Sequence, residues 1–100
     1  MAGSIFWYRA QCAHYVRDIR DEISFNFGYS FVVEKNKGIS GSYQWTVIFD
    51  KGMTPGDAAV IQQTFISSLR AFAQERSLVL AHSGIIYEDG SLKQHFGISM

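Results

Sequence analysis

Residues 23–34 read ISFNFGYSFVVE, with an apolar or aromatic side chain at every odd position from Ile23 to Val33. Small or polar residues occupy most of the positions between them. Alternation with a period of two is typical of a β-strand that buries one of its faces. We therefore predict one long strand over residues 23–34.

A second alternating segment follows, after a glycine-containing loop over residues 36–42. It carries apolar side chains at the odd positions from Tyr43 to Phe49 and mostly polar ones between them. Two alternating segments joined by a short loop are typical of an antiparallel hairpin. We expect residues 43–49 to form a strand that pairs with the first.

The N-terminal segment has the spacing of a helix. Its apolar residues recur every three or four positions, at Tyr8, Cys12, Tyr15, Ile19 and Ile23. This spacing places them on one helical face and predicts a helix over residues 6–22, although residues 5–8 also fit a short strand. Ser4 is expected to cap the helix start, and Arg17 and Asp21, one turn apart, are expected to form a surface ion pair.

Residues 54–76 carry the strongest helix signal in the chain. Thr54-Pro55-Gly56-Asp57 combines an N-cap threonine, a proline at the first helical position and an aspartate in the first turn. An apolar stripe follows with helical spacing. It consists of Ala58, Ile61, Phe65, Leu69, Phe72 and Ala73.

The C-terminal segment has the pattern of a tight hairpin, with strands over residues 78–87 and 92–98. The turn is Glu88-Asp89-Gly90-Ser91, and Asp-Gly suits a two-residue turn that needs positive φ at both central positions. Counting back from it pairs His82 with Gly97 and Gly84 with His95. That register places both imidazoles on one face of the sheet, and Val79, Ala81, Phe96 and Ile98 on the core face.

The element order αββαββ predicts a single α+β domain over residues 1–100. We expect a two-layer sandwich in which two helices pack on one face of a four-stranded, mainly antiparallel sheet. The opposite face is expected to be exposed. It would present Ser24, Asn26, Ser30, Gln44 and Thr46.

The composition favours a packed core and gives no global charge. Hydrophobic residues make up 47% of the chain and charged residues 18%, unlike a disordered tail. The formal net charge is zero, so no overall field attracts nucleic acid or an acidic membrane. A single cysteine, Cys12, forms no internal disulfide and fits a reducing compartment. With no charged leader, and with Arg9 interrupting the first apolar run, a cytoplasmic location is expected.

Several patterns suggest chemistry, and for each we favour a structural role. Residues 27–32, FGYSFV, resemble the aromatic core of an RNA recognition motif, but no basic residue precedes the glycine, so core packing is expected. Cys12 and His14 would lie on different sides of the predicted helix, so we expect no nucleophile–base pair there. The glycine-rich residues 38–42 precede a strand and are unsuited to phosphate binding.

His82 and His95 form the most specific candidate site, since the expected register makes them diagonal neighbours on one face. Two imidazoles are too few for a specific zinc site, which takes three or four ligands. We therefore expect no metal and no cofactor. A small-ligand or metal-responsive role for the two histidines remains an alternative.

Residues 49–84 combine a strand, a Gly-x-Thr turn, a helix and a second strand, LVLAHSG. This arrangement resembles the middle of the YggL-type small ribosome-associated proteins over part of the chain. The chain lacks the basic N-terminal arm of that family. The resemblance implies a ribosome or RNA partner, which is a further alternative.

The absence of paired catalytic groups, together with abundant aromatic residues, favours a non-catalytic protein-binding module. We expect a binding module or inhibitor that acts by occupying a surface of a larger macromolecular partner. Inhibitors encoded by phages or mobile elements often have this size and few motifs. The partner would be another protein, nucleic acid and membrane are not expected, and a homodimer is compatible with the sequence. The expected binding residues are Asn26, Ser30, Gln44, Thr46, His82 and His95.

Overall fold

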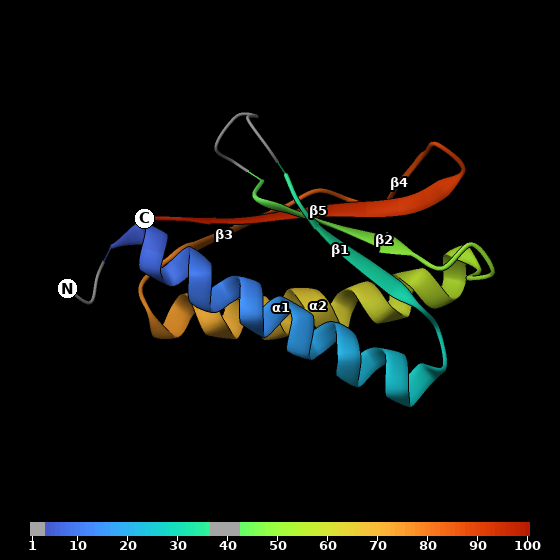
Figure 1. Cartoon of the computed structure of the whole chain (residues 1–100), viewed down its shortest axis with the longest axis horizontal. Helices are drawn as coiled ribbons and strands as arrows, with labels where there is room; N and C mark the ends of the chain where they lie inside the picture. The colour runs from blue at the N-terminus through green and yellow to red at the C-terminus, as the bar shows by residue number, and fades with distance from the viewer. Residues whose placement is uncertain (1–3, 37–42) are drawn as a thin grey trace.

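The computed structural model describes residues 4–36 and 43–100 and has an α+β fold. Figure 1 shows both helices on one face of a single sheet, and the described residues place no helix over the other face. The expected two-layer arrangement is therefore confirmed. The elements in chain order are α1 (Ile5–Phe27), β1 (Phe31–Lys35), β2 (Trp45–Phe49), α2 (Pro55–Glu75), β3 (Val79–His82), β4 (Ile86–Glu88) and β5 (Ser91–Ser99).

The sheet has the strand order β1-β2-β5-β3, and β4 also pairs with β5. Every pairing is antiparallel. The long strand β5 pairs with β2 on one side and with β3 and β4 in succession on the other. The sheet has five strands because the segment expected to be one strand over residues 78–87 is divided into two.

The strand predicted over residues 23–34 is wrong over residues 23–30. α1 continues to Phe27, and β1 begins only at Phe31. Ile23 fits both periods, and its burial with Ile19 on the same helix stripe favours the helix. Gly28, in the left-handed conformation with φ 77°, ends the helix and donates its N–H to Ser24 O at 2.9 Å.

This correction removes three residues from the expected open sheet face. Ser24 and Asn26 lie in the last turns of α1, and Ser30 lies between α1 and β1. Ser24 Oγ donates a hydrogen bond to Tyr29 O at 2.6 Å, and Ser30 N–H donates one to Asp50 Oδ2 at 3.1 Å. These contacts secure the chain reversal that follows α1.

The start of α1 agrees only in part with expectation. Residues 5–8 are helical, which excludes the short strand considered for them. Ser4 occupies the N-cap position, but its side chain makes no capping hydrogen bond. The expected Arg17–Asp21 ion pair does not form, because Asp21 pairs with Arg20 at 2.9 Å.

α2 forms as its sequence predicts. Thr54 Oγ1 accepts a hydrogen bond from Asp57 N–H at 3.1 Å, and Pro55 is the first helical residue. Phe65, fully buried, lies at the centre of the core, with ring-centroid distances of 6.1 Å to Phe31 and 6.0 Å to Phe96. The predicted stripe of Ala58, Ile61, Phe65, Leu69, Phe72 and Ala73 is buried throughout.

The C-terminal turn is confirmed, but the register beyond it is wrong. Asp89 and Gly90 have φ of 53° and 79°, as a two-residue turn of this type requires. Three residues, 83–85, then lie opposite the two residues 94–95, because His82 pairs with Phe96 and Ile86 with Lys93. The extra residue is a β-bulge, and it shifts β3 by one position.

Buried Gln94 stabilises this bulge. Its Nε2 donates hydrogen bonds to Ser83 O at 2.8 Å and to Gln62 Oε1 at 3.0 Å. His95 N–H donates to Ser83 Oγ at 2.9 Å. Polar groups that the bulge removes from the regular ladder thereby gain other partners.

The shift of one position exchanges the two faces of β3. Leu80 packs against the core, whereas Val79 is 59% exposed. The expectation that Val79 and Ala81 lie on the core face is therefore wrong. Phe96 and Ile98 do, and both are buried.

Candidate functional site

The open face of the sheet carries a continuous row of aliphatic groups. Val32 on β1 pairs with Ile48 on β2, Ile48 pairs with Lys93 on β5, and Lys93 pairs with Ile86 on β4. Paired residues of an antiparallel ladder project to the same face, so these four side chains lie in line across the sheet. We call Val32, Ile48, Lys93 and Ile86 the aliphatic row.

Lys93 belongs to this row through its methylene groups. Its side chain is only 16% exposed, although neither α1 nor α2 covers this face. The ammonium nitrogen lies 3.6 Å from Glu88 Oε1 and 3.6 Å from Asp89 Oδ2. The charge is therefore held at the hairpin turn, while the stem extends the apolar surface between its neighbours.

A polar row runs beside the aliphatic row. Glu34 pairs with Thr46, and Thr46 pairs with His95, so these three side chains also project from the open face. We call them the polar row. Thr46 is buried within it, and the ring of Tyr43 stacks on the His95 imidazole with centroids 5.7 Å apart.

The hydrogen bonds of the polar row have a fixed direction. Asn36 Nδ2 donates to Tyr43 O at 3.3 Å, so Asn36 Oδ1 accepts from the Thr46 hydroxyl at 2.7 Å. The hydroxyl has one proton, and its oxygen must then accept from His95 Nδ1, also at 2.7 Å. The neutral imidazole consequently carries its proton on Nδ1, and Nε2 is left as an acceptor.

The structure brings together only two of the six expected binding residues. Thr46 and His95 are hydrogen-bonded neighbours. Gln44 precedes β2, and its Oε1 accepts a hydrogen bond from Ile98 N–H at 2.8 Å. Asn26 and Ser30 lie outside the sheet.

The expected shared site of His82 and His95 does not form. His82 pairs with Phe96, whose side chain is in the core, whereas His95 pairs with Thr46 on the open face. The two imidazoles therefore lie on opposite faces because of the bulge. In residues 4–36 and 43–100, no group of three or more His, Cys, Asp or Glu side chains is placed to hold a metal ion.

The other sequence patterns give no reactive centre in the described residues. Burial raises the pKa of the Cys12 thiol to about 12, so at neutral pH it is protonated and a poor nucleophile. Phe27 lies in α1 and is half-exposed, whereas Phe31 is buried, so they do not form a stacking platform on the sheet. The glycine-rich residues 38–42 lie outside the described residues.

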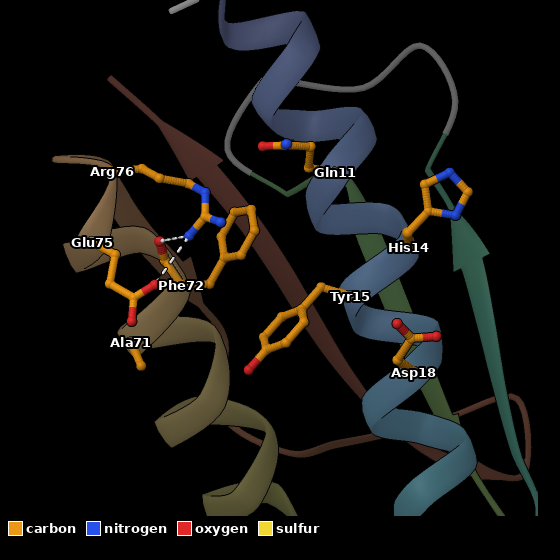
Figure 2. Close-up of a pocket in the computed structure, with 8 residues that line it drawn as sticks. All are labelled: Gln11, His14, Tyr15, Asp18, Ala71, Phe72, Glu75 and Arg76. Atoms are coloured by element: carbon orange, nitrogen blue, oxygen red, sulfur yellow. Dashed lines mark hydrogen bonds and ion pairs between the residues drawn. The ribbon is translucent and has the colours of Figure 1, made fainter. Parts of the chain in front are cut away.

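A small cavity of about 290 Å³ lies between the two helices (Figure 2). Arg76 lines this cavity, and its guanidinium carbon lies 3.8 Å from the Phe72 ring centroid. The same guanidinium donates to Phe72 O at 3.0 Å and pairs with Glu75 at 3.4 Å. Figure 2 shows the His14 ring pointing away from Phe72 and Arg76. These contacts hold Arg76 against the C-terminal end of α2.

Comparison of the chain with protein-family models, curated proteins and solved structures finds no match. The resemblance to the ribosome-associated family therefore gains no support, and a ribosome partner stays a prediction. Among the described residues, no helix is long and apolar enough to cross a membrane.

The alternation pattern did not predict the aliphatic row, although two residues in the sequence point to it. Val32 and Ile48 are apolar residues at positions where strict alternation would place polar ones. Their meeting with Lys93 and Ile86 depends on the pairing of four strands, which the alternation within each strand does not specify.

Proposed function

We propose that this protein is a non-catalytic binding module that contacts another protein through its open sheet face. The observation that carries the proposal is the aliphatic row on the face that neither α1 nor α2 covers. Val32, at one end of the row, is 52% exposed, and Ile48 and Ile86 are half-buried. An apolar strip bordered by polar side chains is the usual composition of a protein interface.

The width of the apolar surface supports a macromolecular partner. The aliphatic row crosses the whole sheet, from Val32 on the edge strand β1 to Ile86 on β4, which lies at the other edge. An apolar row that extends between both edges of the sheet suits another protein better than a small ligand, which needs a concave site.

The polar row supports the proposal through its rigidity. Thr46 is bonded on both sides, to Asn36 and to His95, and Tyr43 covers the imidazole. Side chains that are already held in one conformation lose little entropy on binding. The His95 ring would give the partner one polar contact of defined geometry beside the apolar strip.

Affinity capture with the tagged full chain, followed by reconstitution with the purified partner, tests this function. Val32→Arg places a charge in the aliphatic row at a half-exposed position, so we expect it to weaken binding at least tenfold while the fold is retained. Val60→Arg is the matched control, because Val60 is 62% exposed on α2, away from the sheet face.

The proposal requires a partner that the wild type and Val60→Arg bind and that Val32→Arg loses. Equal binding by both variants would place the interface elsewhere and contradict the proposal. Capture of RNA with a steep dependence on salt would favour the nucleic-acid alternative instead. Inhibition of the partner's activity on binding would support the inhibitor role that we expect.

A further inference from the structure

A larger cavity, of about 610 Å³, lies on the helix-bearing side of the sheet. It is bounded by the first half of α1, the end of β1 and the start of β2. We call it the cationic groove. Its lining residues are Phe6, Arg9, Ala10, Ala13, His14, Arg17, Lys35, Gln44 and Trp45.

The groove gathers positive charge in a chain whose net charge is zero. Arg9, Arg17 and Lys35 all line it, and no carboxylate does. Of the five other Lys and Arg residues in the described part of the chain, Arg20, Arg76 and Lys93 are paired with carboxylates at 2.9–3.6 Å, whereas Lys51 and Arg70 are not.

The three groove cations have no carboxylate partner among the described residues. All nine Asp and Glu residues of the chain lie within residues 4–36 and 43–100, and there none pairs with Arg9, Arg17 or Lys35. Within the described residues, Arg9 makes two long hydrogen bonds, of 3.3 and 3.4 Å, both to Ile98 O. Like charges held around one concavity repel each other, and an anion bound between them relieves that repulsion.

Four of the six other lining residues are apolar and suit a ring, and the remaining two are His14 and Gln44. Trp45 is buried and forms part of the wall, Ala10 and Ala13 leave space beside it, and Phe6, 76% exposed, stands at the rim. A volume of about 610 Å³ lies within the range of about 300–1,000 Å³ found for small-molecule sites.

We propose that the cationic groove binds a small organic anion that carries at least two negative charges and an apolar body the size of one or two rings. Arg9, Arg17 and Lys35 bind the anionic groups, and Phe6 and Trp45 contact the ring. This site lies on the other side of the sheet from the aliphatic row, so it is independent of the proposed protein-binding surface.

A ¹H–¹⁵N NMR titration of the full chain with ADP tests the site. We expect ADP to shift the indole N–H signal of Trp45 and the amide signals of residues 6–17 and 35. Inorganic pyrophosphate supplies the charge without the ring and should bind more weakly, and adenosine supplies the ring without the charge and should not bind. Citrate distinguishes a carboxylate ligand from a phosphate ligand, since either chemistry fits three cations.

Substitutions locate the binding. Arg17→Ala and Lys35→Ala should each weaken the binding of ADP about tenfold or more, because each removes a charged partner of the anion. Arg70→Ala and Lys51→Ala are matched controls, since both cations also lack a carboxylate partner in the described residues but lie outside the groove. They should bind ADP as the wild type does.

Two results would overturn the proposal. One is the absence of shifts at the groove with ADP, pyrophosphate and citrate at millimolar concentrations. The other is equal weakening by the groove and control substitutions, which would indicate nonspecific attraction. Equal affinity for ADP and pyrophosphate would overturn the requirement for an apolar body.

Discussion

Thr46 and His95 lie side by side on the open face of the sheet, with 2.7 Å between Thr46 Oγ1 and His95 Nδ1. Because Thr46 donates its only hydroxyl proton to Asn36, the imidazole must be the donor in this contact. The arrangement links β2 to β5 through side chains and directs Nε2 of His95 to act as an acceptor.

This direction predicts the tautomer of His95. In the neutral form we expect the proton on Nδ1, whereas a free histidine favours Nε2. Long-range ¹H–¹⁵N correlation spectra of the imidazole distinguish the two forms. Thr46→Val removes the acceptor, so the Nδ1 preference should be lost in that variant; a neutral His95 protonated on Nε2 in the wild type would refute the hydrogen-bond chain.

The core should depend on Phe65, which is fully buried between Phe31 and Phe96. We expect Phe65→Ala to lower the free energy of unfolding by about 3–5 kcal/mol, because the cavity adds to the lost transfer free energy. Chemical denaturation measures this change. Val60→Ala, on the exposed side of the same helix, should change it by less than about 0.5 kcal/mol. Similar losses in both variants would contradict the placement of α2.

The Cys12 thiol should be inert in the native protein. Burial raises its pKa to about 12 and also blocks access to it. We expect no reaction with a thiol-specific disulfide reagent at pH 7 over minutes, and one equivalent of reaction after denaturation. Rapid labelling of the native chain at neutral pH would show that α1 does not pack as described.

Tyr29 should make stability depend on pH in the alkaline range. Its hydroxyl donates to Asp57 Oδ2 at 2.6 Å, and this bond together with the nearby carboxylates raises the pKa of Tyr29 above its ordinary value of 10.0. A folded-state pKa above the unfolded value gives stabilisation that is complete below about pH 10 and is lost as the pH rises through the folded-state pKa.

The measurement is the difference in unfolding free energy between the wild type and Tyr29→Phe as a function of pH. This difference should be constant below about pH 9 and shrink above about pH 10. Tyr87→Phe, which changes an exposed hydroxyl, is the control and should show no such trend. A difference that grows with alkaline pH would contradict the assignment.

The parts of the fold that the sequence predicts well are those set by interactions between neighbouring residues, such as a helix cap and a hairpin turn. Thr54 caps α2 as expected, and Asp89 and Gly90 form the expected turn. Both features depend only on residues that are close together in the sequence. The segment around Ile23 was mispredicted because helix and strand periods coincide there. Only packing against the core, and the stop at Gly28, selects the helix.

The candidate site was less predictable than the fold. One extra residue near Ser83, stabilised by buried Gln94, moves His82 to the opposite face from His95. A bulge of this kind is decided by side-chain hydrogen bonds between strands, which turn chemistry does not specify. The aliphatic row likewise exists only once four strands are in register.

Methyl NMR spectra of the chain, recorded with and without the purified partner, test the open-face interface most directly. The account predicts that the methyl signals of Val32, Ile48 and Ile86 shift or broaden on binding. The signals of Val60 and of buried Ile61 on α2 should stay unchanged. Perturbations confined to α1 and α2, with the aliphatic row unaffected, would contradict the claim that this protein binds its partner through the open face of the sheet.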